Sequence, residues 1–134
     1  MKYLLDANAC VGWLRNNQPT LVARVNATPP DDIRLCSVVV GELEYGVEKS
    51  PLAFRPANAA RLALFRAKYG SLPYDDSAAE EYGRIRAVLA TAGQLIGPND
   101  LMIAAIARLH GLAVVTHNTA EFGRVHGLSV EDWQ

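Results

Sequence analysis

Three acidic residues lie at positions where a parallel α/β fold places its functional side chains. Asp6 directly follows the strand-like stretch Lys2–Leu5, and Glu42 lies just past the apolar run Ile33–Val40. Asp100 falls in the first turn of a strongly apolar predicted helix. Because the carboxyl ends of parallel strands meet at one edge of a sheet, we expect the three carboxylates to lie close together there.

A cluster of three carboxylates needs a counter-charge. Each acid alone can be explained as a helix cap or as a favourable charge at a helix N-terminus, an interaction of about 0.3–1 kcal/mol. Two carboxylates ~5 Å apart at an effective dielectric of ~20 instead repel each other by roughly 3 kcal/mol. Oxygen ligands without cysteine or histidine favour Mg²⁺ or Mn²⁺ over Zn²⁺. The three acids therefore predict a hard divalent cation, whose typical chemistry is phosphate-ester hydrolysis by an activated water.

The elements that must position these acids alternate between strands and helices. Alternation of this kind is typical of an α/β fold with a mainly parallel sheet, and continuous apolar strands indicate that helices cover both faces. The predicted helix 77–92 has Ser77 as its N-cap and Gly93 after its C-terminus. The stretch 50–58 contains two prolines and is predicted to be a loop. The predicted strands are 2–5, 33–40, 112–116 and short edge strands near 71–76 and 128–132, and the predicted helices are 9–16, 20–26, one from 41 onward, 59–69, 77–92 and 97–111.

Length and composition fit one globular domain spanning residues 1–134. The formal charge of −1 excludes a global basic field, so any nucleic-acid binding must depend on local clusters. Cys10 and Cys36 lie in apolar stretches without metal-ligand spacing, which is typical of reduced cysteines in the cytoplasm. We find no signal peptide and no apolar run long enough to span a membrane. Phosphate-binding glycine loops and the G-x-S-x-G nucleophile motif are also absent.

Five segments in order carry a family resemblance. They are LLDAN at 4–8, GELEYGVEKS at 41–50, YGRIRAVL at 82–89, IGPNDLMIAA at 96–105 and VVTHNTAEF at 114–122. Together they resemble the PIN-domain ribonucleases of the VapC toxin type, from bacterial type II toxin–antitoxin pairs. The resemblance extends over Lys2 to Trp133.

The resemblance implies Mg²⁺- or Mn²⁺-dependent cleavage of RNA, often of a structured RNA such as a tRNA. It implies a homodimer and a cognate VapB-type antitoxin whose C-terminal arm covers the active site. By motif, Asp6, Glu42 and Asp100 become the metal-binding and catalytic acids, the same three that the topology selects.

Two departures from the family pattern affect the expected site. Where many PIN domains have a fourth acid, this chain has Asn118, with Glu121 three residues later. Either side chain can take that place, Asn118 through its carbonyl oxygen or Glu121 if a helical turn directs it inward. Ala7 stands where relatives often carry a hydroxyl residue.

Other side chains are predicted in supporting roles. Asn8 and Asn99 belong to the motifs beside the acids. Asn8 can hydrogen-bond a carboxylate and hold its geometry, with a plain turn position as the alternative. His117 follows the third strong strand and either touches substrate or orients its loop. Three arginines are candidates for holding the RNA backbone, with solvated or salt-bridged surface positions as the alternative: Arg15, Arg84 and Arg86.

Two competing functions remain at this point. A catalytically silent PIN fold would act by binding RNA or a protein partner, and metal titration would separate it from a nuclease. An aspartyl-phosphate enzyme with Asp6 as nucleophile is disfavoured, because position 8 is Asn rather than Asp.

Overall fold

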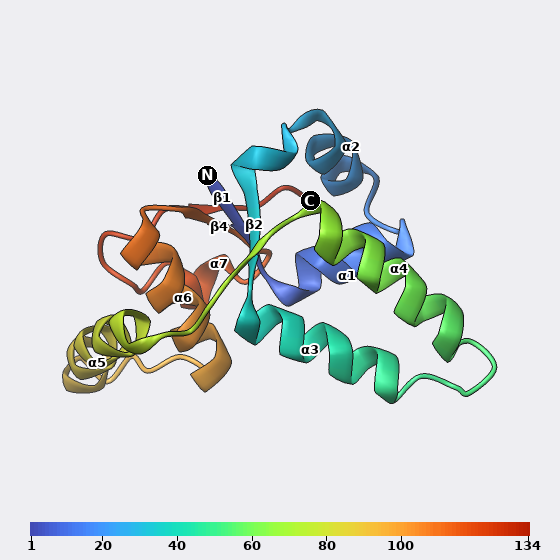
Figure 1. The fold of residues 1–134 in the computed structure, drawn as a ribbon. Helices are drawn as coiled ribbons and strands as arrows, with labels where there is room; N and C mark the ends of the chain where they lie inside the picture. The colour runs from blue at the N-terminus through green and yellow to red at the C-terminus, as the bar shows by residue number, and fades with distance from the viewer.

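A five-stranded parallel sheet forms the centre of the molecule. Figure 1 shows the computed structural model, which describes residues 1–134. The strand order is β3-β2-β1-β4-β5, and all four neighbouring pairs are parallel. The strands are β1 (Tyr3–Leu5), β2 (Ile33–Cys36), β3 (Ser71–Leu72), β4 (Ala113–Val115) and β5 (Val130–Glu131). The predicted α/β class and the two short edge strands are confirmed.

Seven α-helices surround the sheet, and they lie on both sides of it. In Figure 1, α1, α3 and α4 lie to one side of the strands, and α5 and α6 to the other. The helices are α1 (Ala7–Arg15), α2 (Pro19–Ala27), α3 (Ser37–Glu48), α4 (Arg55–Lys68), α5 (Asp76–Thr91), α6 (Pro98–His110) and α7 (Thr119–Phe122). One 3₁₀ turn, Pro30–Asp32, precedes β2. None of the helices combines the length and apolar character that a membrane crossing requires.

The central strands and α6 form the core, as their sequences predict. Leu4, Leu5, Ile33 and Leu35 are completely buried. The helix α6 buries six of its residues, including four consecutive ones from Ala104 to Ala107. A helix that is apolar nearly all round must lie in the interior, where its whole surface meets other side chains. Its N-terminal turn, with Asp100, is thereby fixed against the sheet edge.

The prediction that β2 continues to Val40 is wrong. The strand ends at Cys36, and Ser37 to Val40 form the first turn of α3. β-Branched residues favour strands only where a pleated surface is available to pack them. Here Val39, Leu43 and Val47 recur at helical spacing and are buried, so burial of this face overrides the local propensity.

The helix α4 begins earlier than predicted. Its first residue is Arg55, within the stretch 50–58 that the sequence predicts as a loop. Pro56 stands in the first turn, where a missing N–H costs the helix nothing. A proline there marks a helix start rather than a loop.

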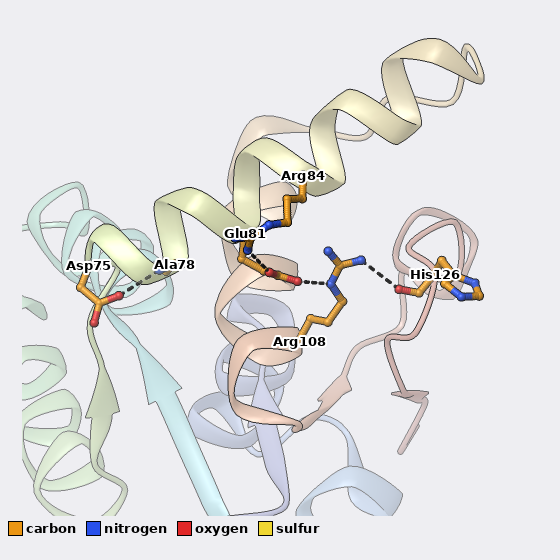
Figure 2. Close-up of polar contacts among 6 residues, drawn as sticks. All are labelled: Asp75, Ala78, Glu81, Arg84, Arg108 and His126. Carbon is orange, nitrogen blue, oxygen red and sulfur yellow. Dashed lines mark hydrogen bonds and ion pairs between the residues drawn. The ribbon is translucent and has the colours of Figure 1, made fainter.

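The helix α5 is capped by Asp75, not by Ser77 as predicted. The Asp75 carboxylate accepts a hydrogen bond from the Ala78 amide at 3.0 Å (Figure 2). Ser77 lies inside the helix, which begins at Asp76. Aspartate and serine are comparable N-caps. Here the cap is Asp75, two residues before Ser77. Gly93 follows the helix with a positive φ of 66°, as the sequence predicts.

One partly buried ion-pair network joins α5 to α6. The Glu81 carboxylate accepts hydrogen bonds from Arg108 and, at 2.9 Å, from Arg84 (Figure 2). Arg108 also donates to the carbonyl oxygen of His126 at 3.1 Å. Burial raises the pKa of Glu81, but the bonds from Arg108 and Arg84 outweigh it and hold that pKa below its usual range.

Candidate active site

Asp6 joins the end of β1 to the start of α1. Its amide continues the sheet by donating to the carbonyl oxygen of Val115 at 3.1 Å. Its side chain caps α1 by accepting from the Ala9 amide at 2.8 Å. Only 6% of the residue is exposed, so the carboxylate is held rigidly at the carboxyl edge of the sheet.

The environment of Asp6 disfavours its charge. Burial raises the pKa of its carboxyl group, while the Thr116 hydroxyl and the Ala9 amide lower it in part. The carboxylates of Glu42 and Asp132 raise this pKa further. The net direction is upward, which is the signature of a buried acid with negative neighbours and no cation beside it.

Asp100 meets both residues that compete for the fourth acidic place. Asn118 donates to Asp100 Oδ2 at 3.1 Å and to Glu121 Oε2 at 2.5 Å. Burial, followed by the hydrogen bond and charge of Glu121, raises the pKa of Asp100 to about 6, and Asp6 contributes in the same direction. Glu121 therefore does point inward, through the helical turn of α7, and Asn118 links the two carboxylates.

Glu42 is held by an amide from the opposite side of the site. Asn99, in the first turn of α6, donates to Glu42 Oε1 at 2.7 Å. Glu42 lies in the second turn of α3, next to the buried Leu43, and is half-buried itself. The carboxylate contact predicted for Asn8 is thus made instead by Asn99, which the sequence indicates only as a supporting residue.

The three predicted acids share one edge but do not form a closed ligand shell. Asp6 interacts electrostatically with both Glu42 and Asp100. No three Asp, Glu, His or Cys side chains converge tightly enough to hold a metal ion among them. The donor set nevertheless fits a hard divalent cation, because it consists of carboxylate and amide oxygens whose repulsion a cation would relieve.

Two residues of the site escape prediction from the sequence. Thr116 is buried directly after the end of β4. Its hydroxyl lies near Asp6 and accepts a hydrogen bond from the backbone amide of Asn118 at 2.9 Å. Asp132 directly follows β5, and its negative charge raises the pKa of Asp6. The Asp132 carboxylate contacts His117 Nδ1 at 3.0 Å. Their positions just past parallel strands are the signal that identifies them.

The predicted RNA-binding arginines separate into two regions. Arg15 lies at the C-terminal end of α1 and, with Asn8 and Glu42, lines a groove that extends from the acidic edge. Arg84 pairs with Glu81, and Arg86 donates to the Tyr82 hydroxyl at 3.0 Å, so both are engaged on α5. Figure 1 shows α5 at the opposite end of the molecule from α4.

Comparison with known proteins identifies the fold family. Residues 3–128 match the PIN domain, which is nearly the full chain. The chain belongs to the PIN domain family. Among its relatives, the tRNA(fMet)-specific endonuclease VapC of Shigella flexneri is 42% identical over 133 residues, covering 99% of this chain and 98% of that protein. The Ribonuclease VapC2 of Haemophilus influenzae is 37% identical with the same coverage.

Solved structures agree with this PIN domain over its whole length. A chain of DNA-bound VapBC from Salmonella typhimurium is 40% identical, with a TM-score of 0.91 and coverage of 100% of this chain and 99% of that one. VapBC2 from Rickettsia felis, bound to a DNA fragment from its promoter, gives a TM-score of 0.89 at 30% identity with full coverage of both chains. The chain is therefore a VapC-type PIN domain, as the five sequence segments predict.

Proposed function

We propose that this PIN domain is a metal-dependent endoribonuclease and the toxin of a type II toxin–antitoxin pair. The observation that carries the proposal is the gathering of acids at the carboxyl edge of the sheet. Burial raises the pKa of both aspartates there, and so do neighbouring carboxylates: Glu42 and Asp132 act on Asp6, and Glu121 and Asp6 act on Asp100. Such strain among carboxylates is typical of sites built for a cation.

Asp6, Glu42 and Asp100 are the proposed ligands of Mg²⁺, or of Mn²⁺ in its place. The bound ion would polarise a phosphoryl oxygen and lower the pKa of a coordinated water. The protein's own contribution is positioning: Asn99 orients Glu42, and Asn118 holds Asp100 beside Glu121. Glu121 and Asn118 together take the fourth-acid place that the sequence leaves open between them.

The proposed substrate is a structured RNA, and a tRNA is the first candidate. Two relatives at 42% and 40% identity are named as tRNA(fMet)-specific endonucleases, and both align over 99% of this chain. Identity at this level with full coverage supports the same reaction class. We propose initiator tRNA as the RNA to test first.

The proposed partners follow from the related assemblies. Structures of VapBC from Salmonella typhimurium and of VapBC2 from Rickettsia felis are similar to this chain over its full length. We propose a VapB-type antitoxin whose C-terminal arm covers the acidic edge, and a homodimer of the toxin. Cys10 and Cys36 are both free and buried, which supports action in the reducing cytoplasm.

Cleavage of initiator tRNA and of other tRNAs, with Mg²⁺, with Mn²⁺ and with excess EDTA, tests the proposal. We expect site-specific cleavage with either metal, none in EDTA, and none from Asp6→Asn. Robust cleavage by Asp6→Asn in EDTA would contradict the mechanism. If the wild type binds RNA with Mn²⁺ present but leaves it intact, the protein is instead a silent PIN fold acting as a binding module.

A further inference from the structure

A groove opens beside the acidic edge between α1, α3 and α4. Its volume is about 380 Å³, within the range of small ligand sites, and it is open to solvent. Asn8 and Glu42 line it where it meets the acidic residues. From Glu42 it follows α3 as far as Lys49, seven residues or about 10 Å along the helix axis.

Three cations line this groove without a carboxylate partner. They are Arg15, Lys49 and Arg61. The ion pairs of the molecule involve other Lys and Arg residues, namely Lys2, Arg24, Arg66, Arg84 and Arg108. With Glu42 the only acid among the lining residues, the groove carries a local positive charge in a protein of net charge −1.

Arg61 is held in place by uncharged partners. Its guanidinium donates to Asn58 Oδ1 at 2.7 Å and to the carbonyl oxygen of Leu14 at 3.4 Å. These bonds place the guanidinium between α4 and α1 without neutralising its charge. An exposed, unneutralised guanidinium is well suited to a phosphate, which it can bind through two parallel N–H bonds.

The rest of the groove suits ribose and base. Its floor is apolar, formed by Val11, Leu14, Leu43, Val47 and Leu62. Tyr45 lines the same groove with 66% of its surface exposed, and the Lys49 ammonium lies 5.1 Å from its ring centroid. An exposed aromatic ring beside cations is the arrangement on which single-stranded nucleic acids stack their bases.

We propose that this groove binds the single-stranded RNA segment on one side of the cleaved phosphate, with Arg61 and Lys49 as phosphate contacts and Tyr45 as a stacking surface. The inference rests on the proposed ribonuclease function, and it adds the residues that contact the RNA beside the cleaved phosphate. An acidic centre repels the RNA backbone, so the attraction must come from neighbouring cations. Arg15, Lys49 and Arg61 line the same groove as Glu42, so they are placed to supply this attraction.

The proposal is tested by measuring how tightly groove variants and control variants bind RNA. Lys49→Gln, Arg61→Gln and their double variant are compared with Lys2→Gln and Arg66→Gln, which change the same charges outside the groove. Arg66 is the matched control for Arg61, because it lies on the same helix and is already neutralised by Glu44 at 3.1 Å. All are made in the Asp6→Asn background and titrated with a short labelled single-stranded RNA and with labelled initiator tRNA.

We expect each groove variant to weaken binding of both RNAs by roughly fivefold to tenfold and to flatten the salt dependence by about 0.7 per lost contact. Tyr45→Leu is expected to weaken binding by about tenfold with the salt dependence unchanged. In the active protein, the groove variants should raise KM with kcat retained, because they contact RNA away from the reacting phosphate.

Equal RNA affinity in the groove variants and the two controls would overturn the proposal. If the groove variants lose binding of a poly-glutamate peptide but keep RNA affinity, the groove is a docking surface for an acidic protein segment instead. Either result leaves the proposed function intact when the wild type cleaves RNA and Asp6→Asn does not. Failure of the wild type to cleave any RNA would count against the proposed function itself.

Discussion

Asn99 and Glu42, 57 positions apart in the sequence, are joined by a 2.7 Å hydrogen bond across the acidic edge. The amide comes from the first turn of α6 and the carboxylate from the second turn of α3. The contact thus sets the orientation of one proposed metal ligand from the helix that carries another, Asp100. The donor is an uncharged amide, so the bond orients the ligand without supplying an opposite charge.

Replacing Asn99 is expected to reduce metal affinity without unfolding the protein. Asn99→Ala leaves Glu42 free to rotate, and loss of an orienting partner of this kind typically costs 10- to 100-fold in metal affinity or activity. The measurement is the Mn²⁺ concentration that half-saturates RNA cleavage. An unchanged metal requirement in Asn99→Ala would show that the contact does not position a ligand.

Two substitutions of Asp6 should separate its roles as cap and as acid. Asp6→Asn keeps an oxygen that can accept from the Ala9 amide, so the metal-free variant should be at least as stable as the wild type. Asp6→Ala removes the cap and should lie about 1 kcal/mol below Asp6→Asn. Urea denaturation in EDTA measures both, and neither variant should cleave RNA. Equal stability of the two would mean that the cap contributes nothing.

The metal-free protein should lose stability as the pH rises toward neutrality. The pKa of Asp100 is raised from its ordinary 3.8 to about 6, so the folded state holds a proton that the unfolded chain releases earlier. Stability from this group is therefore present below about pH 4 and is lost as the pH rises through about 6.

Asp100→Asn should remove that pH dependence. In EDTA we expect it to be more stable than the wild type at pH 7.5, by about 1 kcal/mol after allowance for partial solvent screening, and no more stable at pH 4. Added Mn²⁺ should stabilise the wild type but not the variant. A wild type that is more stable than Asp100→Asn at pH 7.5 without metal would contradict the electrostatic account.

The Glu81 network should produce the opposite pH dependence. The pKa of Glu81 is lowered from its ordinary 4.5, so its contribution is present above that value and is lost as the pH falls through the lower folded value. Glu81→Gln should destabilise the protein by about 1 kcal/mol at pH 7 and by less at a pH well below 4.5. RNA cleavage per folded molecule should not change. A destabilisation that is the same at both pH values would exclude the ion pairs as its cause.

The sequence predicts which residues come to the acidic edge better than it predicts how they touch. Strand–helix alternation is a strong periodic signal, and it brings Asp6 within electrostatic reach of both Glu42 and Asp100. The hydrogen bonds of Asn99 and Asn118 are not predictable in this way. They depend on side-chain directions at two helix starts that only the packed structure defines.

The start of α3 shows where local propensity fails. Three consecutive valines after Ser37 favour a strand, yet they form a helix because Val39 and Val47 bury on one face with Leu43. The mistaken strand prediction for residues 37–40 does not change the expected position of Glu42. Glu42 adjoins Leu43 and so lies at the border of that buried face. The role of Arg61 is missed for another reason: it depends on the approach of α4 to α1, two helices whose contact no local pattern encodes.

The order of the strands also bears on when the protein becomes active during its synthesis. The central strand β1 pairs on one side with β4, so Leu4 receives that neighbour, Val114, only when most of the chain has been made. A nascent chain that ends before α6 contains Asp6 and Glu42 but lacks Asp100, Asn118 and Glu121. The proposed metal site therefore stays incomplete while the chain is being made, and its residues can come together only when synthesis is nearly finished.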